Sequence, residues 1–342
     1  MTASENAESG SEPVPSTLRS NSFNSCEWRK RVTIVLNFAD QDRELLAKLN
    51  RQSVERSFTP QIDIDWSQET TLPEYASLFP VTSLFAGTRF EKEFAELSRT
   101  QIIQYQQINL MRFTGQLERH GISVLAQLYD ADDSQPFTEY LGNFLKEEIY
   151  HFTMFSRAGG QIEQSMGNVP ALPVWRIDLV MRVLFGCIAM TPGRRLRANL
   201  TFRFFQFAEQ LSIYVHQAVQ RTIPRETGLI SQVWALHAID ESRHLAFDRL
   251  MLERYKLRAP LSWMATGVTA VCCVVLALVA NSNEVWAARR LGVKVRLWHL
   301  PVLLRSTTAP FKLRIQQLLK EILRGGSVAA TQPKSDSEYV EL

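Results

Sequence analysis

The chain has 342 residues, of which 45% are hydrophobic and 21% are charged, so it is long and apolar enough to bury a sizeable core. Its net charge of +3 is small for this length and argues against a general affinity for nucleic acid. The four cysteines form no Cys-x-x-Cys pair, which argues against a zinc finger or an iron–sulfur centre and suits a reducing, cytoplasmic compartment.

The two ends of the chain are predicted to be disordered tails. Residues 1–28 are rich in Ser, Glu, Asn and Pro and contain no apolar run of the kind found in a signal peptide. Residues 325–342 have a similar composition. Between the tails we expect a helical body over residues 40–255 and further helices over residues 256–324.

The first part of the body is predicted to be one helix followed by an extended segment. Residues 37–58 carry leucines among charged residues and are expected to form an amphipathic helix. Residues 59–80 contain Pro60, Pro73 and Pro80, which predict a loop that wraps the body. Neither segment contains residues that indicate chemistry.

Long helices dominate the rest of the body. Four of them are predicted, together with a fifth, outer helix over residues 175–190; the four cover residues 90–129, 137–155, 200–221 and 227–255. We expect Gly159-Gly160 to end the second helix and residues 192–197 to form a basic turn before the third.

The last of these helices carries the strongest functional signal. His237, Glu241 and His244 lie at positions i, i+4 and i+7, which places them in one stripe along a single helix face. Two imidazoles and a carboxylate on one face are typical of metal ligands. The second helix contains another Glu-x-x-His pair, formed by Glu148 and His151.

The first and third helices each contain one acid among apolar residues. Glu118 precedes Glu148 by 30 residues, and Glu209 precedes Glu241 by 32, so each half of the body is a Glu, a turn and a Glu-x-x-His pair. A helix of about 20 residues is roughly 30 Å long, and a turn at its end brings the two acids back to one level. For Glu118 alone, an ion pair with Arg119 is an alternative to metal binding.

Two Glu-x-x-His helices and one Glu from each of two more helices are the ligand pattern of ferritin-like bundles. Over roughly residues 85–255, the order of these residues resembles the p-aminobenzoate N-oxygenase family of ferritin-like diiron enzymes. The mark of that family is a third histidine one turn before the last Glu-x-x-His pair, which is the place of His237. The resemblance implies an all-α fold: a ferritin-like four-helix bundle with a di-metal carboxylate centre and extra C-terminal helices. The implied metal ligands are Glu118, Glu148, His151, Glu209, His237, Glu241 and His244.

The resemblance also implies a reaction. A diiron oxygenase of this family activates O2 and oxidises a small organic substrate, through N-oxygenation of an aryl amine or a related hydroxylation. Carboxylates with a few imidazoles suit two Fe ions, and Mn is an alternative. The chain contains no Gly-x-Gly-x-x-Gly motif and no cysteine set of a reductase, so we expect a separate electron donor protein.

The ligands divide between two ions in the expected arrangement. Glu118, Glu148 and His151 are assigned to one ion, and Glu209, His244 and His237 with Glu241 to the other. Glu148 and Glu241 are the expected bridges. His216 lies seven residues after Glu209 and is a second candidate for the extra histidine ligand.

Several other polar residues lie near these motifs. Glu147 points about 100° away from Glu148 and is not expected to be a ligand. Asp240 and Asp248 lie one turn from the histidines of the fourth helix and either orient imidazole N–H groups or lie on the surface. Three tyrosines are either redox-active or, more simply, buried structural residues: Tyr105, Tyr150 and Tyr214.

Residues 261–280 contain no charge and are long enough to cross a bilayer as a helix. We favour a helix that is buried or lies on a membrane surface, because Ser262, Thr266 and Thr269 interrupt the apolar run and a metal-site helix directly precedes it. A membrane-associated localisation and a homodimer stay open. Residues 286–324 alternate basic and apolar residues, which indicates a pair of amphipathic helices or a surface that contacts anionic lipid or a partner.

Two other functions compete with an oxygenase. One is a non-catalytic, ferritin-like metal-binding protein. The other is a membrane-associated interaction protein in which the ligand motifs are coincidental.

Overall fold

The computed structural model describes residues 39–68, 72–129, 135–167, 172–223 and 228–323, and both predicted tails lie outside these ranges. Every element in the described ranges is a helix, which confirms the predicted all-α class. The longer helices are α1 (Asp40–Glu55), α3 (Leu72–Thr82), α4 (Glu96–Ala126), α5 (Gln135–Ser165), α6 (Trp175–Met190), α7 (Arg194–Gln220), α8 (Leu229–Arg254), α9 (Ala259–Arg290) and α11 (Pro310–Leu323). The short ones are α2 (Pro60–Asp63), η2 (Arg89–Glu93), η3 (Leu297–His299) and α10 (Leu300–Ser306).

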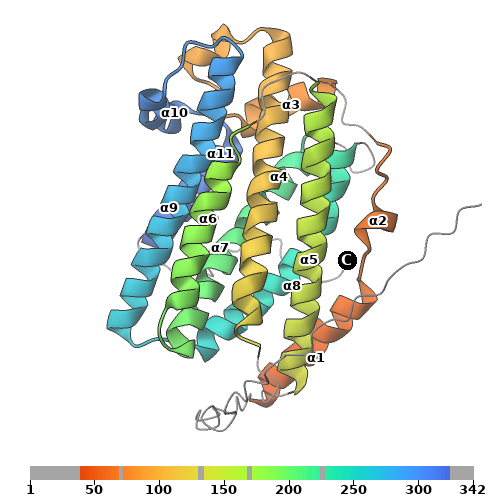
Figure 1. The fold of residues 1–342 in the computed structure, drawn as a ribbon, viewed down its shortest axis with the longest axis vertical. Helices are drawn as coiled ribbons and strands as arrows, with labels where there is room; N and C mark the ends of the chain where they lie inside the picture. Colours follow the sequence, from red (N-terminus) through yellow and green to blue (C-terminus); the bar gives the residue numbers. More distant parts are fainter. Residues whose placement is uncertain (1–38, 69–71, 130–134, 168–171, 224–227, 324–342) are drawn as a thin grey trace, which may run out of the picture. The chain divides into compact units, whose positions relative to one another are not determined.

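Two helical hairpins form the centre of the fold. Helices α4 and α5 form the first hairpin and α7 and α8 the second, and the two hairpins face each other as a four-helix bundle (Figure 1). The helix α6 connects the hairpins and packs on the outside of α4, as predicted. This architecture is the four-helix bundle expected from the two-fold order of the acidic motifs.

Glycines define where the second hairpin begins and how closely it approaches the first. Gly193 and Gly228 immediately precede α7 and α8 with φ of 81° and 85°, a conformation that residues with a Cβ rarely adopt. Gly121 of α4 lies against the ring of Phe205 of α7, and a Cβ at this glycine would overlap the Phe205 Cζ atom. The two hairpins therefore meet closely about one helical turn from Glu118.

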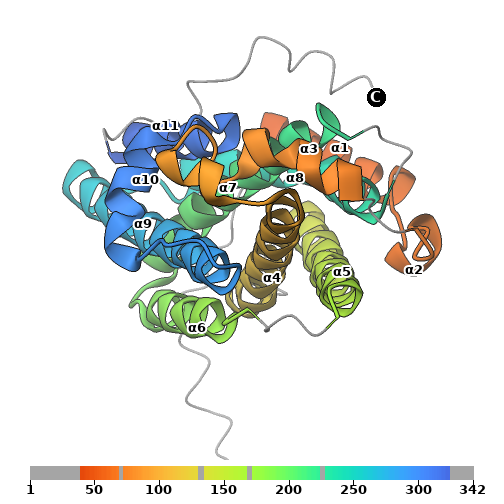
Figure 2. The same cartoon turned by 90° about the horizontal axis from the view of Figure 1, so that it is seen from above.

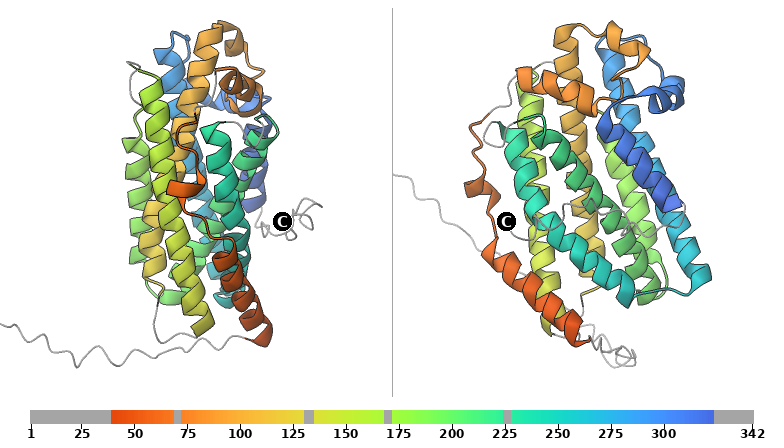
Figure 3. Two further views of the ribbon diagram at one scale, coloured as in Figure 1. Left: turned by 90° about the vertical axis from the view of Figure 1, so that its right-hand side faces the viewer. Right: turned by 180° about the vertical axis from the view of Figure 1, so that it is seen from behind.

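The remaining helices cover the bundle. Helix α9 packs against α4 and α7, and α11 packs on α9, α3 and α7 (Figure 2). Helix α1 packs against α5 and α8 on another side of the bundle (Figure 3). The boundary that we predict near residue 256 stays a prediction; in space, the helices beyond it contact those before it.

Three local predictions were wrong. The segment 59–80 is not an extended loop, because α2 and α3 occupy much of it and Pro80 lies within α3. Helix α3 buries Tyr75, Leu78 and Phe79, and this burial outweighs the prolines. The Gly159-Gly160 pair does not end α5, which continues to Ser165 and buries Ile162 in the core. The basic turn is also shorter than predicted, since α7 begins at Arg194.

The apolar segment 261–280 lies within α9. By length and composition α9 is the one described helix that meets the criteria for a membrane span, with a mean hydropathy of 2.2. Only 28% of its apolar window is buried inside the protein. The helix therefore has one side that packs on the bundle and another that does not.

Candidate metal centre

The seven residues predicted as ligands come from all four helices of the bundle. Helix α4 contributes Glu118, α5 contributes Glu148 and His151, and α7 contributes Glu209. Helix α8 contributes His237, Glu241 and His244. Each of these side chains is at most 4% exposed. Four carboxylates and three imidazoles in one core require polar partners or cations, because unpaired polar or ionised groups are costly to bury.

The seven side chains form three overlapping groups. Within each group, one ligand atom per residue lies within 4.8 Å of those of the others; the groups are Glu118, His151, His237 and Glu241, then Glu148, His151 and His244, and then Glu209, Glu241 and His244. Each group shares a residue with each other group. The sequence therefore predicted correctly which seven side chains lie together, while their role as ligands stays a proposal.

The donor atoms of this cluster fit metal ions better than they fit one another. Among the described residues, both carboxylate oxygens of Glu148 and of Glu241 have no hydrogen-bond partner, and neither do Nδ1 of His151 and Nδ1 of His244. His244 Nδ1 lies 3.1 Å from Glu148 Oε1 without the geometry of a hydrogen bond. Buried polar atoms are almost always paired, so unpaired oxygens and nitrogens that face each other indicate a cation site.

His237 lies with one of the residues that we grouped with it, Glu241, and not with Glu209 or His244. Its Nε2 atom is 3.5 Å from Glu118 Oε1 and 2.5 Å from Glu241 Oε1, and it belongs to the group that contains His151. Glu209 belongs to a group without His237. The spacing in α8 predicted that His237 faces the centre but could not predict which end of the centre it faces.

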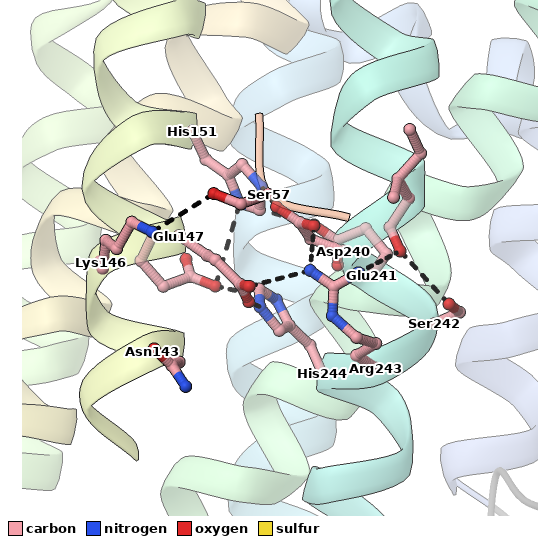
Figure 4. Close-up of polar contacts among 12 residues, drawn as sticks. Ser57, Asn143, Lys146, Glu147, His151, Asp240, Glu241, Ser242, Arg243 and His244 are labelled. Carbon is pink, nitrogen blue, oxygen red and sulfur yellow. Dashed lines mark hydrogen bonds and ion pairs between the residues drawn. The ribbon is translucent and has the colours of Figure 1, made fainter. Parts of the chain in front are cut away.

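The imidazoles of His151 and His244 are oriented by acids from the opposite helix. His151 of α5 contacts Asp240 Oδ2 of α8 through Nε2 at 3.1 Å. His244 of α8 contacts Glu147 Oε2 of α5 through Nε2 at 2.9 Å. Each Nδ1 atom is thereby directed toward the acids of the cluster (Figure 4). Carboxylates in this position fix the ring and raise the basicity of a metal-binding histidine.

Arg243 links these two acids. Its Nη2 atom donates to Glu147 Oε1 at 2.8 Å and also contacts Asp240 Oδ1 (Figure 4). The sequence left open whether Asp240 orients an imidazole or lies on the surface; it is buried and binds His151 of α5. Glu147 points away from the cluster, as predicted, but it points to α8 and binds His244, a role that helical periodicity alone did not predict.

The charges around the cluster shift several pKa values. Burial acts to raise the pKa of Glu147, but the hydrogen bond to His244 and the charges of His244 and Arg243 outweigh it and lower this pKa to about 2. Burial, together with the nearby histidines, lowers the pKa of His237 well below its ordinary value. Burial raises the pKa of Glu241 well above its ordinary value. His237 is therefore neutral near pH 7, which is the form that binds a metal.

The other polar residues singled out in the sequence lie outside the three groups. His216 is buried, and its charge contributes to the lowered pKa of His237, but it belongs to none of the groups. The remaining histidine of the four bundle helices is His120 of α4, which contacts Asp178 of α6 at 3.1 Å. Asp248 is completely buried, so the surface interpretation was wrong, and burial raises its pKa well above the ordinary value.

The three tyrosines make contacts with residues outside the ligand cluster. Tyr105 is buried and packs edge-on against Trp286, and the Tyr214 hydroxyl accepts a hydrogen bond from Arg314 at 2.6 Å. The Lys146 ammonium lies over the ring of Tyr150. Tyr105 is buried as we preferred, whereas Tyr150 and Tyr214 are only half-buried, so a buried position was wrong for these two.

Aromatic rings surround the histidines. Phe144 stacks on His244 with 3.9 Å between ring centroids, and Phe155 meets His237 edge-on at 4.7 Å. These rings exclude water and restrict the imidazoles. Phe144 lies four residues, about one helical turn, before Glu148 in the sequence. This spacing places Phe144 on the same helix face as Glu148, and it was the one signal in the sequence for a ring beside the cluster.

A small pocket lies between α4 and α7, beside the cluster. Its lining is apolar except for Thr114 and Ser212. Thr114 is one turn before Glu118 in α4, and Ser212 is about one turn after Glu209 in α7. These two side chains are near Glu118 and Glu209 in the sequence, but neither carboxylate is among the residues that line the pocket.

A comparison with protein families agrees with this geometry. The family model described as P-aminobenzoate N-oxygenase AurF matches residues 39–296, which is most of the chain. The chain belongs to this family. Members of the AurF family are ferritin-like diiron proteins and oxygenases, so the fold expected from the sequence is confirmed. A search of curated proteins gave no match. The match includes all of α1 and α9 as well as the four bundle helices.

Proposed function

We propose that the protein is a non-haem diiron oxygenase that uses O2 to oxidise a small organic substrate. The preferred reaction is N-oxygenation of an aryl amine, with a related hydroxylation as the second form. The observation that carries this proposal is the buried cluster of four carboxylates and three imidazoles in a chain of the AurF family. Bound iron would supply the activation of O2.

The proposed ligand set divides the cluster into two ends. Glu118, His151 and His237 would hold one ion, and Glu209 and His244 would hold the other. Glu148 and Glu241 would bridge, which is supported by the presence of Glu241 in two of the groups and by the position of Glu148 between His151 and His244. Hard oxygen donors with a few imidazoles support iron, and manganese is the alternative that elemental analysis would distinguish.

The residues around the ligands prepare the centre for this chemistry. Asp240 and Glu147 hold the outer nitrogens of His151 and His244, so that the inner nitrogens keep a fixed direction. The rings of Phe144 and Phe155 keep water away from the imidazoles. Such preorganisation lets the centre bind cations without rearranging the helices.

We infer that the substrate approaches from the pocket between α4 and α7. The cavity there is about 10 Å³, room for about one water molecule, so an aromatic substrate would enter only after the apolar side chains between the two helices move apart. Thr114 and Ser212 would supply hydrogen bonds, and Leu117 and Leu211 would contact the ring. A pocket next to Glu118 and Glu209 would place such a substrate at the edge of the metal centre.

The electrons for the reaction would come from a separate protein, since the sequence contains no nucleotide-binding glycine motif. The three cysteines in the described residues are free thiols. We propose that the protein acts in a reducing compartment, the cytoplasm.

The decisive experiment is elemental analysis of the purified chain beside two double variants. Glu148→Ala/Glu241→Ala removes the proposed bridges, and Glu139→Ala/Glu253→Ala removes two exposed acids from the same two helices. We expect two irons per chain, lost only in the first variant. Metal retained by that variant, or none in the wild type, contradicts the proposal.

Activity is then tested on the iron-loaded protein with a chemical reductant, 18O2 and a panel of anilines. Incorporation of labelled oxygen at the amine nitrogen supports N-oxygenation, and incorporation at carbon supports hydroxylation. Iron that is bound without any labelled product would instead support the non-catalytic metal-binding protein.

A further inference from the structure

Helix α9 carries an exposed apolar stripe along its outer side. Met264, Val268, Val271, Val275 and Leu278 are spaced by three or four residues, so they share one helix face. Each of them is exposed, and Val271 reaches 61%. The opposite side of α9 is buried against the bundle. Only 28% of the apolar window is buried, so packing inside the protein does not account for the exposed apolar residues.

Helix α6 extends this surface. It lies beside α9 and packs against it (Figures 1 and 2). Trp175, Leu179, Val183 and Met190 share one face of α6 and are also exposed. We call the α9 stripe and these four residues the α6/α9 face. So many large apolar side chains on two adjacent helices indicate a surface that contacts another apolar phase.

Tryptophans and arginines border the α6/α9 face. Trp263 near the start of α9 is 75% exposed, and Trp298 beyond the end of α9 is 65% exposed. The Arg296 guanidinium lies 4.7 Å from the centre of the Trp298 ring. Indole rings with neighbouring basic groups are typical of residues at the boundary between lipid and water.

The charge around this face has one sign. Residues 257–306 contain six Lys and Arg residues and a single acid, Glu284. That acid is buried and paired with Lys312, so it does not reduce the positive charge at the surface. Asp178 on α6 is likewise paired, with Arg182 at 2.7 Å. Basic groups around an apolar surface complement an anionic lipid headgroup layer.

We propose that the α6/α9 face docks in the plane of an anionic membrane. The apolar side chains would enter the acyl boundary, and Arg258, Arg289 and Arg290 would meet the headgroups. A second copy of the chain fits less well, because a symmetric contact would bring the same basic residues together. A full crossing by α9 also fits less well, because it would remove Ala265, Ala270 and Cys273 from their packing on the bundle.

The proposal is tested by co-sedimentation of the full chain with vesicles. Vesicles of phosphatidylcholine alone are compared with vesicles that also contain phosphatidylglycerol. We expect binding to the anionic vesicles, and weaker binding as salt is added. Replacement of Arg289 and Arg290 by Gln should reduce the preference for the anionic vesicles.

A matched pair of variants locates the contact. Val271→Gln/Val275→Gln should lower vesicle binding by roughly tenfold or more, since two apolar side chains no longer enter the lipid. Val54→Gln/Ile62→Gln changes two exposed β-branched residues on α1 and α2 and should leave binding unchanged. Circular dichroism of all variants checks that the helices are intact.

Three results would overturn the proposal. Wild-type protein that binds neither kind of vesicle is one. Lipid-free protein that forms a dimer by light scattering, lost in Val271→Gln/Val275→Gln, with no vesicle binding, would assign the face to a second copy. Vesicle binding that resists alkaline carbonate would place α9 across the bilayer. None of these measurements depends on metal or turnover, so they test the surface separately from the proposed oxygenase.

Discussion

Glu147 of α5 and Asp240 of α8 have equivalent positions, because each directly precedes a Glu of a Glu-x-x-His pair and each contacts the histidine of the opposite helix. The two contacts measure 2.9 Å, to His244, and 3.1 Å, to His151. Arg243 lies between the two acids and contacts both. The acid next to each proposed ligand thus serves the other half of the centre.

Removing the charge of either acid should weaken metal binding at one end of the centre. We expect Glu147→Gln to lower metal affinity roughly 10–100-fold at the end that contains His244, and Asp240→Asn to do so at the end that contains His151. Chelator competition measures both affinities. Glu163→Gln removes an acid of α5 that pairs with Arg112 at 2.7 Å and should leave both unchanged.

The stability of the metal-free protein should depend on pH through Glu147. Its pKa is about 2 in the folded protein and ordinarily 4.5, so the ionised form stabilises the fold. This contribution is complete above pH 4.5 and is lost as the pH falls toward 2. A shift of this size corresponds to about 3 kcal/mol. The free energy of unfolding, measured by denaturant titration from pH 6 downward, should fall less steeply in Glu147→Gln than in the wild type.

His237→Ala should reduce metal content and O2-dependent turnover while the fold stays intact. The reason is that His237 Nε2 faces both Glu118 and Glu241, and alanine offers no replacement donor. His216→Ala is the informative comparison, because His216 was the second candidate for this ligand position. Metal content that falls in His216→Ala and not in His237→Ala would reverse the assignment. His120→Ala, which changes only a contact to α6, serves as the control.

Gly121→Ala should destabilise the protein by about 1–3 kcal/mol, because the added methyl group would overlap the buried ring of Phe205. Gly142→Ala, in the exposed part of α5 with no atom near its Cβ position, should instead stabilise the protein by about 0.5–1 kcal/mol. Thermal unfolding distinguishes the two. Equal effects at both positions would show that α4 and α7 do not need to approach closely at Gly121.

Helical periodicity and the order of the motifs were sufficient to predict the bundle and the seven clustered side chains. Periodicity states which residues share a face, but it does not state which neighbour faces them. For this reason Glu147 was set aside although it binds His244, and periodicity did not show that His237 faces Glu118 of the other hairpin as well as Glu241. The same limit applies to Asp248, whose burial depends on helices that are distant in sequence.

Proline and glycine were less reliable than helical periodicity for predicting where the helices begin and end. Pro80 lies within α3, and Gly159-Gly160 lies within α5, because both helices are stabilised by what they bury against the rest of the fold. Local preferences of about 1–3 kcal/mol are outweighed when several large side chains enter the core. For α9, the apolar run predicted a long helix but not that one side of it would stay exposed.

The crosswise contacts of Glu147 and Asp240 also bear on the order in which the centre is assembled. During synthesis the first hairpin emerges with His151 but without Asp240, and it lacks the acid that fixes this imidazole until α8 is complete. The second hairpin in turn requires Glu147 of the first hairpin to fix the imidazole of His244. Neither hairpin by itself supplies the full ligand set with its histidines fixed in direction. A nascent chain would therefore select poorly between cations, and it would also bind a wrong cation only weakly. Selection of the ion would take place only after the two halves have docked.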